Sequence, residues 1–255
     1  MIYGWDHPET ARAYEDFCRR HPRYLVANQA LIAAAALGPG QRILDLAAGT
    51  GRTAELALEH LEGRCEVACL ELAAAMREIG EPRVPQARWI SEWPLGETFD
   101  RILCGAAIWQ FPRLDEIFKQ ASLALLPGGA FAFNIPIQYL CQPDEPGCSE
   151  DPWLTQMVSH IAEGWEAAGR DSTVMQESSI ETKLSQAGFH TVAWGVRGKL
   201  TQAEYRDWLK IPVLTDALLT HWTAAERAAR IDAAFAKSDA ASWRWEAWRG
   251  WTAWK

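Results

Sequence analysis

Long apolar runs and a surplus of basic residues are both missing from this 255-residue sequence. No stretch approaches the roughly 20 apolar residues that a membrane-spanning helix needs, so we expect no stable membrane insertion. The first ten residues, MIYGWDHPET, lack the charged start and apolar run of a signal peptide, which predicts a cytoplasmic protein. The formal charge of −8 argues against nucleic acid as a partner, because phosphate backbones bind basic surfaces.

Cysteine is also scarce and irregularly spaced. The six cysteines include no CxxC pair of the kind that binds metal, so we predict reduced thiols and no metal site. Tryptophan is abundant by contrast, with fourteen residues. This number indicates that aromatic side chains line a core, a pocket or a surface.

Short apolar runs alternate with helix-like segments from residue 42 onward. The runs lie at residues 42–47, 65–71, 87–91, 100–106 and 130–135, and helical patterns lie between them at 52–61, 73–79 and 112–126. Strands that alternate with helices in this way predict an α/β fold with a doubly wound, mostly parallel sheet. Right-handed crossovers would bring the ends of these strands to one edge of the sheet.

The stretch from Asp45 to Gly51, DLAAGTG, directly follows the first of these runs. Glycines at such a turn let the backbone approach a ligand, and the next helix points free N–H groups at it. Glu71 lies twenty residues further on, at the end of the second strand, where a carboxylate can accept both ribose hydroxyls. These features alone fit a nicotinamide dinucleotide as well as other adenosyl cofactors.

Three details favour a cofactor other than a dinucleotide. Asp45 is a carboxylate at the junction of strand and loop, and it suits a ligand with an ammonium group, bound directly or through water. Phe99 and Asp100 open the fourth strand, and the sequence LPGG precedes the fifth. With these details, the segments LDLAAGTG, CLELAAAM, ETFDRILCGAAIWQF and ALLPGGAFAF resemble the class I S-adenosylmethionine-dependent methyltransferases in order and spacing.

The resemblance is closest to the methyltransferases of small molecules, including those of the ubiquinone/menaquinone and biotin pathways. It covers residues 10 to 135 well and continues more weakly to about residue 215. It implies a Rossmann-like methyltransferase fold with seven strands, S-adenosyl-L-methionine as cofactor, and methylation of an O, C or N atom of a small, largely apolar or aromatic molecule. The alternatives are a nicotinamide-dependent oxidoreductase and a non-catalytic partner subunit that keeps the cofactor site.

The resemblance also implies a set of cofactor-binding residues. Ala47 stands where the family has its first loop glycine, and Trp89 stands where an acidic residue is usual on the third strand. We therefore expect Trp89 to stack on the adenine and Ile90 to make an apolar contact with it. The full set is Tyr14, Asp45, Ala47, Ala48, Gly49, Gly51, Glu71, Leu72, Met76, Trp89, Ile90, Cys104 and Gly105.

Four regions follow from the pattern. Residues 1–40 form an N-terminal helical lid, 41–136 the cofactor-binding core, 137–176 an inserted helical cap after the fifth strand, and 177–255 the rest of the core. The cap is predicted because the alternation stops after Pro136 in a long segment rich in loop-forming residues. We expect further helices to begin at two TxxE capping boxes, at residues 201–204 and 223–226.

Catalytic residues are harder to predict, because a sulfonium already carries a good leaving group and orientation does most of the work. A base is needed only if the acceptor atom must lose a proton. Trp109 occupies the position that often holds histidine in the family. The candidates are His7, Trp109, Gln110, Tyr139 and His160. Each histidine has a simpler interpretation as a surface or capping residue.

The sequence ends in SWRWEAWRGWTAWK. Tryptophan favours membrane interfaces, so this segment could lie on a membrane surface. We favour the alternative that it is the last strand of the sheet, inserted antiparallel to its neighbours with aromatic residues on both faces. Gly250 would then mark a bulge. The pattern does not predict the oligomeric state.

Overall fold

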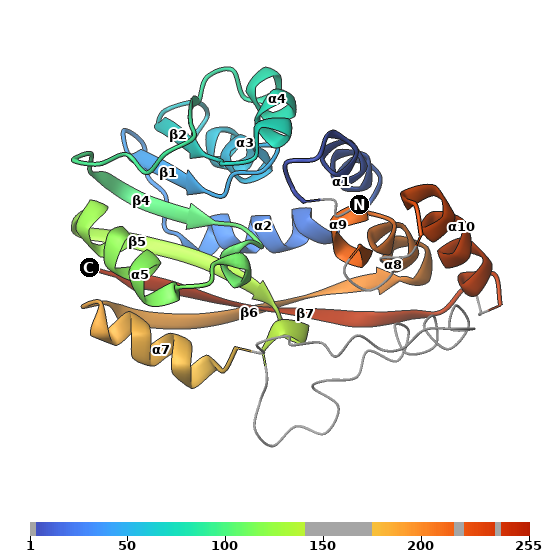
Figure 1. Ribbon diagram of the computed structural model, residues 1–255. Coiled ribbons are helices and arrows are strands. Elements are labelled where there is room, and N and C mark those ends of the chain that lie inside the picture. The colour runs from blue at the N-terminus through green and yellow to red at the C-terminus, as the bar shows by residue number, and fades with distance from the viewer. Residues whose placement is uncertain (1–3, 141–174, 217–221, 238–240) are drawn as a thin grey trace.

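The computed structural model describes residues 4–140, 175–216, 222–237 and 241–255, and seven strands of these residues form one sheet (Figure 1). The strand order is β3-β2-β1-β4-β5-β7-β6, and all neighbours pair in parallel except those of β7, which is antiparallel to both β5 and β6. The predicted doubly wound, mostly parallel sheet is therefore confirmed. The strands are β1 (Arg42–Leu46), β2 (Glu66–Leu70), β3 (Arg88–Ile90), β4 (Phe99–Cys104), β5 (Leu125–Pro136), β6 (His190–Thr201) and β7 (Trp243–Trp254).

Helices cover both faces of the sheet. They are α1 (Pro8–Arg20), α2 (Arg23–Ala34), α3 (Arg52–His60), α4 (Ala74–Arg83), α5 (Leu114–Ala124), α7 (Glu177–Gln186), α8 (Gln202–Leu209), α9 (Pro212–Thr215) and α10 (Ala224–Phe235), with the short 3-10 helices η1 (Ile108–Gln110) and η2 (Ile137–Tyr139). Helix α5 ends earlier than predicted, because Leu126 precedes a proline and such a residue is driven into extended backbone. Strand β5 therefore begins at Leu125.

Side chains of β5 alternate in size between the two faces. Phe131 and Phe133 pack with Phe118 of α5 in one apolar cluster, whereas Ala132 belongs to the cluster beneath α2 and α3. Successive strand residues point to opposite faces, so small side chains on one face let α2 pack close to the sheet. Helix α2 therefore belongs to the core layer, and only α1 keeps the position expected of a lid.

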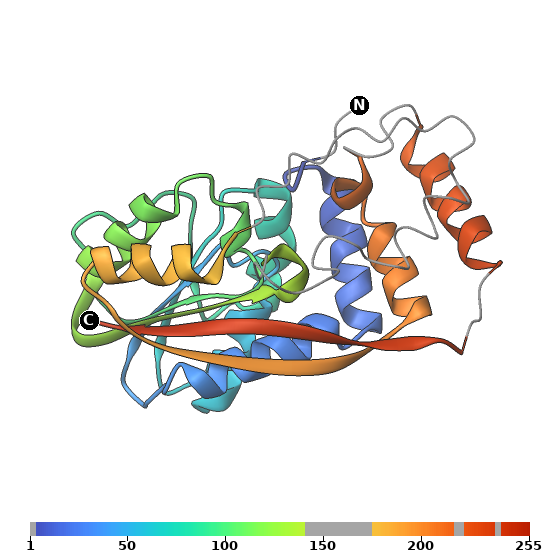
Figure 2. The same cartoon turned by 90° about the horizontal axis from the view of Figure 1, so that it is seen from below.

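Strands β6 and β7 pair over twelve residues and extend well past the ends of the other strands (Figures 1 and 2). Helices α1, α8, α9 and α10 gather over this extension. Phe17, Tyr205, Trp208 and Phe235 form an apolar cluster between them. The extension thus has a core of its own, separate from the two clusters around the sheet.

The tryptophan-rich end of the chain is strand β7, as predicted. Trp248 and Trp251 are buried, whereas Trp243 and Trp245 are 46% and 60% exposed. The predicted bulge at Gly250 is wrong, because the register of β7 with both neighbours is unbroken there. Gly250 is needed for another reason: a Cβ at this position would collide with the indole ring of Trp194.

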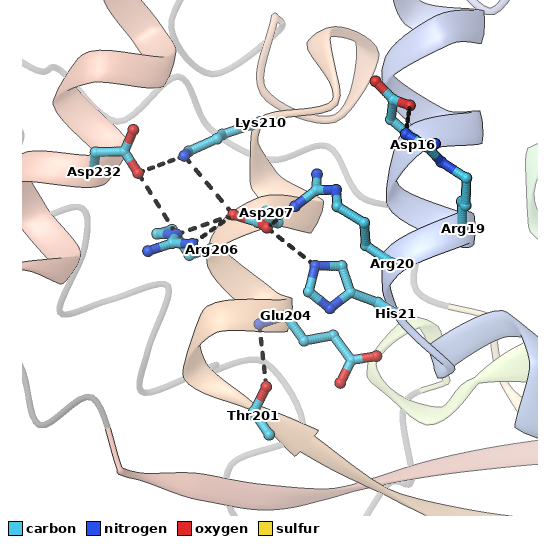
Figure 3. Close-up of polar contacts among 10 residues, drawn as sticks. All are labelled: Asp16, Arg19, Arg20, His21, Thr201, Glu204, Arg206, Asp207, Lys210 and Asp232. Atoms are coloured by element: carbon cyan, nitrogen blue, oxygen red, sulfur yellow. Dashed lines mark hydrogen bonds and ion pairs between the residues drawn. The ribbon is translucent and has the colours of Figure 1, made fainter.

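Asp207 ties α1 to α8 in the extension (Figure 3). Its carboxylate contacts Arg20 and His21 from the end of α1, and Arg206 and Lys210 from its own neighbourhood. Burial raises the pKa of Asp207, but hydrogen bonds from His21, Arg206 and Arg20 outweigh it and lower the pKa to about 2. The carboxylate is therefore charged at neutral pH and holds four cationic or potentially cationic groups.

One of the two predicted capping boxes is incomplete. The box of Thr223 and Glu226 is confirmed in full at the start of α10. At the start of α8, the Thr201 hydroxyl accepts the Glu204 N–H, but the Glu204 carboxylate instead accepts the backbone N–H of Arg23 at 3.0 Å. Tertiary packing has redirected this carboxylate from its own helix to α2.

A buried ion pair joins α2 to β7. The Arg23 guanidinium donates to both carboxylate oxygens of Glu246 and lies 4.1 Å from the centre of the Trp208 ring. The side chains are 1% and 8% exposed. Such a pair is expensive to break, because the remaining partner becomes an uncompensated buried charge.

No helix in the described part of the chain has the length and apolarity to cross a membrane.

We expect Glu246→Ala to lower the free energy of unfolding by about 3–5 kcal/mol, because Arg23 is left buried without its counter-charge. Urea denaturation followed by circular dichroism would measure the loss. Glu66→Ala is the matched control: Glu66 is 81% exposed and pairs with Arg42 at 3.6 Å, so its removal should cost less than about 0.5 kcal/mol. Equal losses in the two variants would contradict this description.

Candidate active site

A cavity of about 630 Å³ lies at the carboxyl ends of β1, β2 and β4. Its floor includes the last residues of β1 and β2, Leu46 and Leu70, together with Gly105 after β4. Tyr14 of α1 and Tyr24 of α2 contribute to its wall from the N-terminal helices. Parallel strands place their carboxyl ends at one edge, and strand order reverses between β1 and β4, which is where ligands bind in such sheets.

The loop after β1 has the backbone geometry that close approach to a ligand requires. Ala47, Gly49 and Gly51 all have positive φ, at 57°, 57° and 81°. Glycine adopts this conformation without a penalty, which explains the family preference for glycine at Ala47. Ala47, Ala48 and Gly49 line the cavity, but Gly51 does not. A Cβ on Gly51 would lie 2.9 Å from Val84, so this glycine serves packing.

Glu71 lies at the cavity with its carboxylate held by the backbone. One oxygen accepts the Gly49 N–H at 2.7 Å, and the other accepts the Ala73 N–H at 2.8 Å. Each carboxylate oxygen can accept more than one hydrogen bond, so both keep capacity for a ligand hydroxyl. The carboxylate therefore joins the loops after β1 and β2 and offers acceptors to the cavity between them.

Asp45, predicted to bind the ligand, does not line the cavity. Its side chain is 1% exposed and lies outside the cavity wall, and one carboxylate oxygen accepts the Ala54 N–H of α3 at 3.0 Å. Burial raises the pKa of Asp45 to about 8, although the hydrogen bond from Ala54 opposes this shift and the charge of Glu71 adds to it. Asp45 thus anchors the start of α3 from beneath the loop.

Trp89 is also misplaced in the sequence-based prediction. Its indole ring fills the space beside Gly80 and lies 3.1 Å from a Cβ built on Gly51, and it does not reach the cavity. Trp93 lines the cavity in its place. Ligands bind beyond the carboxyl ends of parallel strands, and β3 ends at Ile90. Trp93 follows the strand and reaches the cavity, whereas Trp89 lies within the strand and does not. Ile90 and Cys104 also lie outside the cavity wall, whereas Leu72, Met76 and Gly105 line it.

Two polar atoms at the cavity have no hydrogen-bond partner among the described residues. They are Oδ1 of Asn28, a residue that is 5% exposed, and Nε of Arg52 at the start of α3. A Cβ on Gly105 would come within 2.5 Å of the Thr53 hydroxyl and 2.8 Å of Asn28 Oδ1, so the missing side chain at Gly105 lets these two groups pack against the loop after β4. Buried polar atoms normally have hydrogen-bond partners. An unpaired acceptor and an unpaired donor at this place therefore suit a ligand that carries both a positively and a negatively charged group.

The side chain of Glu15 attaches helix α1 to the loop after β1, residues 47–51, and to the start of α3. Its carboxylate accepts from the Thr50 hydroxyl at 2.9 Å and from Arg52 at 2.6 Å, and it also pairs with Arg83 of α4. These contacts hold α1 beside the cavity, where Tyr14 of α1 and the preceding residues Trp5 and Asp6 form part of the wall. Sequence reasoning missed Glu15, Asn28 and Arg52 because none of them stands in a recognisable motif.

The rest of the wall is mostly apolar and includes three aromatic residues. Trp93, Trp109 and Phe111 lie on it, and Trp109 stacks on Tyr139 with ring centres 4.3 Å apart. Burial raises the pKa of the phenols of Tyr14 and Tyr24 above their usual range. Both tyrosines therefore remain neutral at physiological pH and cannot act as bases unaided.

The structure separates the predicted catalytic candidates. Trp109 and Gln110 line the cavity, whereas Tyr139 supports Trp109 from behind. His7 is the N-cap of α1, and its Nδ1 accepts the Glu9 N–H at 3.2 Å, so the capping interpretation is confirmed, and His7 does not line the cavity. His160 and most of the predicted cap, at residues 141–174, lie outside the described residues.

The raised pKa of Asp45 predicts a pH effect on the stability of the ligand-free protein. The folded state keeps this proton at pH values where the unfolded state, with an ordinary pKa of 3.8, loses it. Asp45 therefore lowers stability progressively as the pH rises from 3.8 to about 8. Asp45→Asn still accepts the Ala54 N–H, so its advantage over the wild type should grow by up to about 1.4 kcal/mol per pH unit in this range.

Urea denaturation of both proteins across this range would measure the difference, which should level off above the folded-state pKa. Profiles that run parallel from acid to alkaline pH would show that Asp45 titrates normally.

The family model described as a methyltransferase domain matches residues 17–193. No curated protein matches the sequence. A methyltransferase structure from Bacillus halodurans C-125 shares 15% identity with a TM-score of 0.57, covering 89% of this chain and 96% of that one. The cyclopropane synthase MmaA2 from Mycobacterium tuberculosis shares 17% identity with a TM-score of 0.55, covering 89% and 82%.

A sarcosine dimethylglycine methyltransferase structure from Galdieria sulphuraria, 15% identical, gives a TM-score of 0.53 and covers 92% of this chain and 85% of that one. At these identities the structures support the fold, and the family model supports the activity. The model covers well over half of the chain and includes the loop after β1, Glu71 and the walls after β3 and β4. The chain therefore belongs to the methyltransferase-domain family, and it is a class I S-adenosylmethionine-dependent methyltransferase.

Proposed function

We propose that the acceptor of the methyl group is a small, largely apolar or aromatic molecule that binds beside the cofactor in the cavity. The observation that carries this proposal is the division of the wall. Asn28, Arg52 and Glu71 supply polar groups for the cofactor, whereas Trp109, Phe111 and Ile117 leave aromatic and apolar surface for the acceptor. An apolar wall with a few placed polar groups is typical of sites for small molecules.

The ribose and adenine would lie between the loops after β1, β2 and β3. Glu71 would accept the ribose hydroxyls with its remaining lone pairs. Leu72, Met76 and Trp93 offer the apolar and aromatic surface that a purine requires. In this assignment Trp93 takes the role that the sequence pattern suggested for Trp89.

The amino-acid end of the cofactor would lie against the unpaired atoms at the opposite side of the loop. Asn28 Oδ1 is an acceptor and suits the ammonium group, while Arg52 Nε is a donor and suits the carboxylate. A nicotinamide dinucleotide has no ammonium group to satisfy Asn28, so this pair of atoms favours S-adenosylmethionine.

The cofactor supplies a methyl group already activated on a sulfonium. The protein's part is then to hold the acceptor in line, exclude water and keep the wall rigid. Trp109 is fixed by its stack on Tyr139 and by donation from Nε1 to the Ala106 carbonyl at 3.1 Å. Asp6 and Glu71 are the carboxylates among the described wall residues. Because Glu71 would hold the ribose, Asp6 is the group that could take a proton from the acceptor.

The N-terminal segment would cover the bound ligands. Helix α1 carries Tyr14 on the cavity wall and is held on the loop after β1 by Glu15. We propose that the described residues up to the end of α1 act as the cover. The alternative of a non-catalytic partner subunit would keep the cofactor cavity but would need no acceptor space.

Isothermal titration calorimetry with S-adenosylhomocysteine and with NADH tests the cofactor. We expect binding of S-adenosylhomocysteine and none of NADH, because the unpaired Asn28 and Arg52 atoms match an amino acid.

Incubating the protein and methyl-tritiated S-adenosylmethionine with a cell extract then tests the acceptor. Label should appear in small molecules that partition into organic solvent. Label confined to protein or nucleic acid would contradict the proposed acceptor, and binding without any transfer would favour the non-catalytic subunit.

Glu71→Gln should weaken S-adenosylhomocysteine binding by roughly 10- to 100-fold, because charge-assisted hydrogen bonds to the ribose are each worth about 1.5–3 kcal/mol. Calorimetry measures the affinity directly. Glu92→Ala is a suitable control, since Glu92 is exposed and lies outside the cavity wall. An unchanged affinity in the folded Glu71 variant would remove this residue from the ribose site.

A further inference from the structure

Asn134 is a single polar side chain in the apolar inner half of β5, whose sequence there is AFAFNIP. It is fully buried, with no exposed surface. A buried amide is costly unless both of its ends are hydrogen-bonded. The alternation of β5 places it on the same face as Ala132, toward α2.

Both ends of the amide are satisfied by backbone groups of two different elements. Oδ1 accepts the N–H of Ala106, in the loop after β4, at 2.7 Å. Nδ2 donates to the carbonyl of Ala27, in α2, at 2.9 Å. One side chain therefore connects helix α2 to the loop that leads from β4 to η1.

The two peptide groups held in this way lie next to the cavity. The Ala27 carbonyl belongs to the peptide group that leads to Asn28, and the Ala106 N–H belongs to the peptide group that follows Gly105. Asn28 and Gly105 both line the cavity and lie directly against each other, since a Cβ on Gly105 would lie 2.8 Å from Asn28 Oδ1. The Asn134 amide thus sets the separation of these two wall residues.

The connection continues to the aromatic wall. Ala106 has a φ of 56°, a backbone conformation that residues other than glycine keep only when their surroundings hold it. The Asn134 hydrogen bond holds it, and the Ala106 carbonyl in turn accepts Nε1–H of Trp109 at 3.1 Å. Trp109 is then stacked on Tyr139.

We propose that Asn134 is a positioning residue that fixes the α2 wall and the Trp109 wall of the cavity relative to each other. It does not line the cavity itself and acts only through Asn28, Ala106 and Trp109. Its use in catalysis rests on the proposed function, but the position of Trp109 can be measured without any ligand. An aliphatic side chain of similar size would fill the same space and lose both connections.

Three variants test this proposal: Asn134→Leu, Asn134→Asp and the control Phe133→Leu. Phe133 is the neighbouring buried residue of β5, but it points to the opposite face and stacks on Phe118 and Trp251. Its substitution costs stability without touching the connection. The measurements are S-adenosylhomocysteine affinity by calorimetry and the near-ultraviolet circular dichroism of the Trp109–Tyr139 stack, with Trp109→Phe as the reference spectrum.

We expect Asn134→Leu to bind S-adenosylhomocysteine about tenfold more weakly or worse, because the Ala106 N–H loses its partner. Its spectrum should shift toward that of Trp109→Phe, whereas Phe133→Leu should keep the affinity, and any change in its spectrum, arising at Trp251, should not resemble that of Trp109→Phe. In Asn134→Asp a protonated carboxyl can replace the amide as donor and acceptor. Its affinity relative to the wild type should therefore recover as the pH falls, while that of Asn134→Leu stays low. Taking the affinity of the variant relative to that of the wild type removes the contribution of groups that titrate in both proteins, such as Asp45.

Wild-type affinity and spectrum in Asn134→Leu would overturn the proposal. So would losses in Phe133→Leu as large as those in Asn134→Leu, because the effect would then be general destabilisation. If the wild type itself does not bind S-adenosylhomocysteine, the proposed function fails. The ligand-free spectra still decide in that case whether Asn134 holds Trp109.

Discussion

The cavity exists because β1 pairs in parallel with β2 on one side and with β4 on the other. This arrangement brings three carboxyl ends to one edge and leaves a crevice where the strand order reverses. The loop after β1 then turns over that crevice through residues of positive φ, and Glu71 holds it there by accepting the Gly49 N–H. Most residues assigned to the site follow these three strand ends, and Trp93 follows the neighbouring strand β3.

Buried polar groups occur where elements from different parts of the chain must be joined. Asp45 anchors α3 beneath the loop, Asn134 joins α2 to the loop after β4, and Arg23 joins α2 to β7 through Glu246. Apolar contacts alone hold elements together but specify distances less strictly than directional hydrogen bonds do. The apolar clusters thus supply most of the stability, while these few polar side chains set the positions of the walls.

Helix α1 is held at two places that belong to different parts of the fold. Glu15, in its middle, binds the loop after β1 and α4, whereas Arg20 and His21 at its end bind Asp207 of α8. The extension formed by β6, β7 and the C-terminal helices therefore supports the same helix that lines the cavity with Tyr14. This connection gives the long C-terminal hairpin a structural relation to the site, although it lies far from Glu71 in the sequence.

The sequence by itself determined the sheet, the class of cofactor and the loop that binds it. The period of the apolar residues, the glycine positions and the carboxylates at strand ends are local properties, and they predicted strands β1 to β5 and the places of Gly49 and Glu71 at the cavity. The tertiary structure decided the outcome where a side chain had a choice of neighbours. Asp45 and Trp89 turned inward because space beneath the loop and beside Gly80 was available, whereas Trp93 reached the cavity. The Glu204 carboxylate accepts the backbone N–H of Arg23 in α2 and does not cap its own helix. Asn28, Arg52 and Asn134 belong to no motif, because their roles arise from contacts between segments that are brought together only by folding.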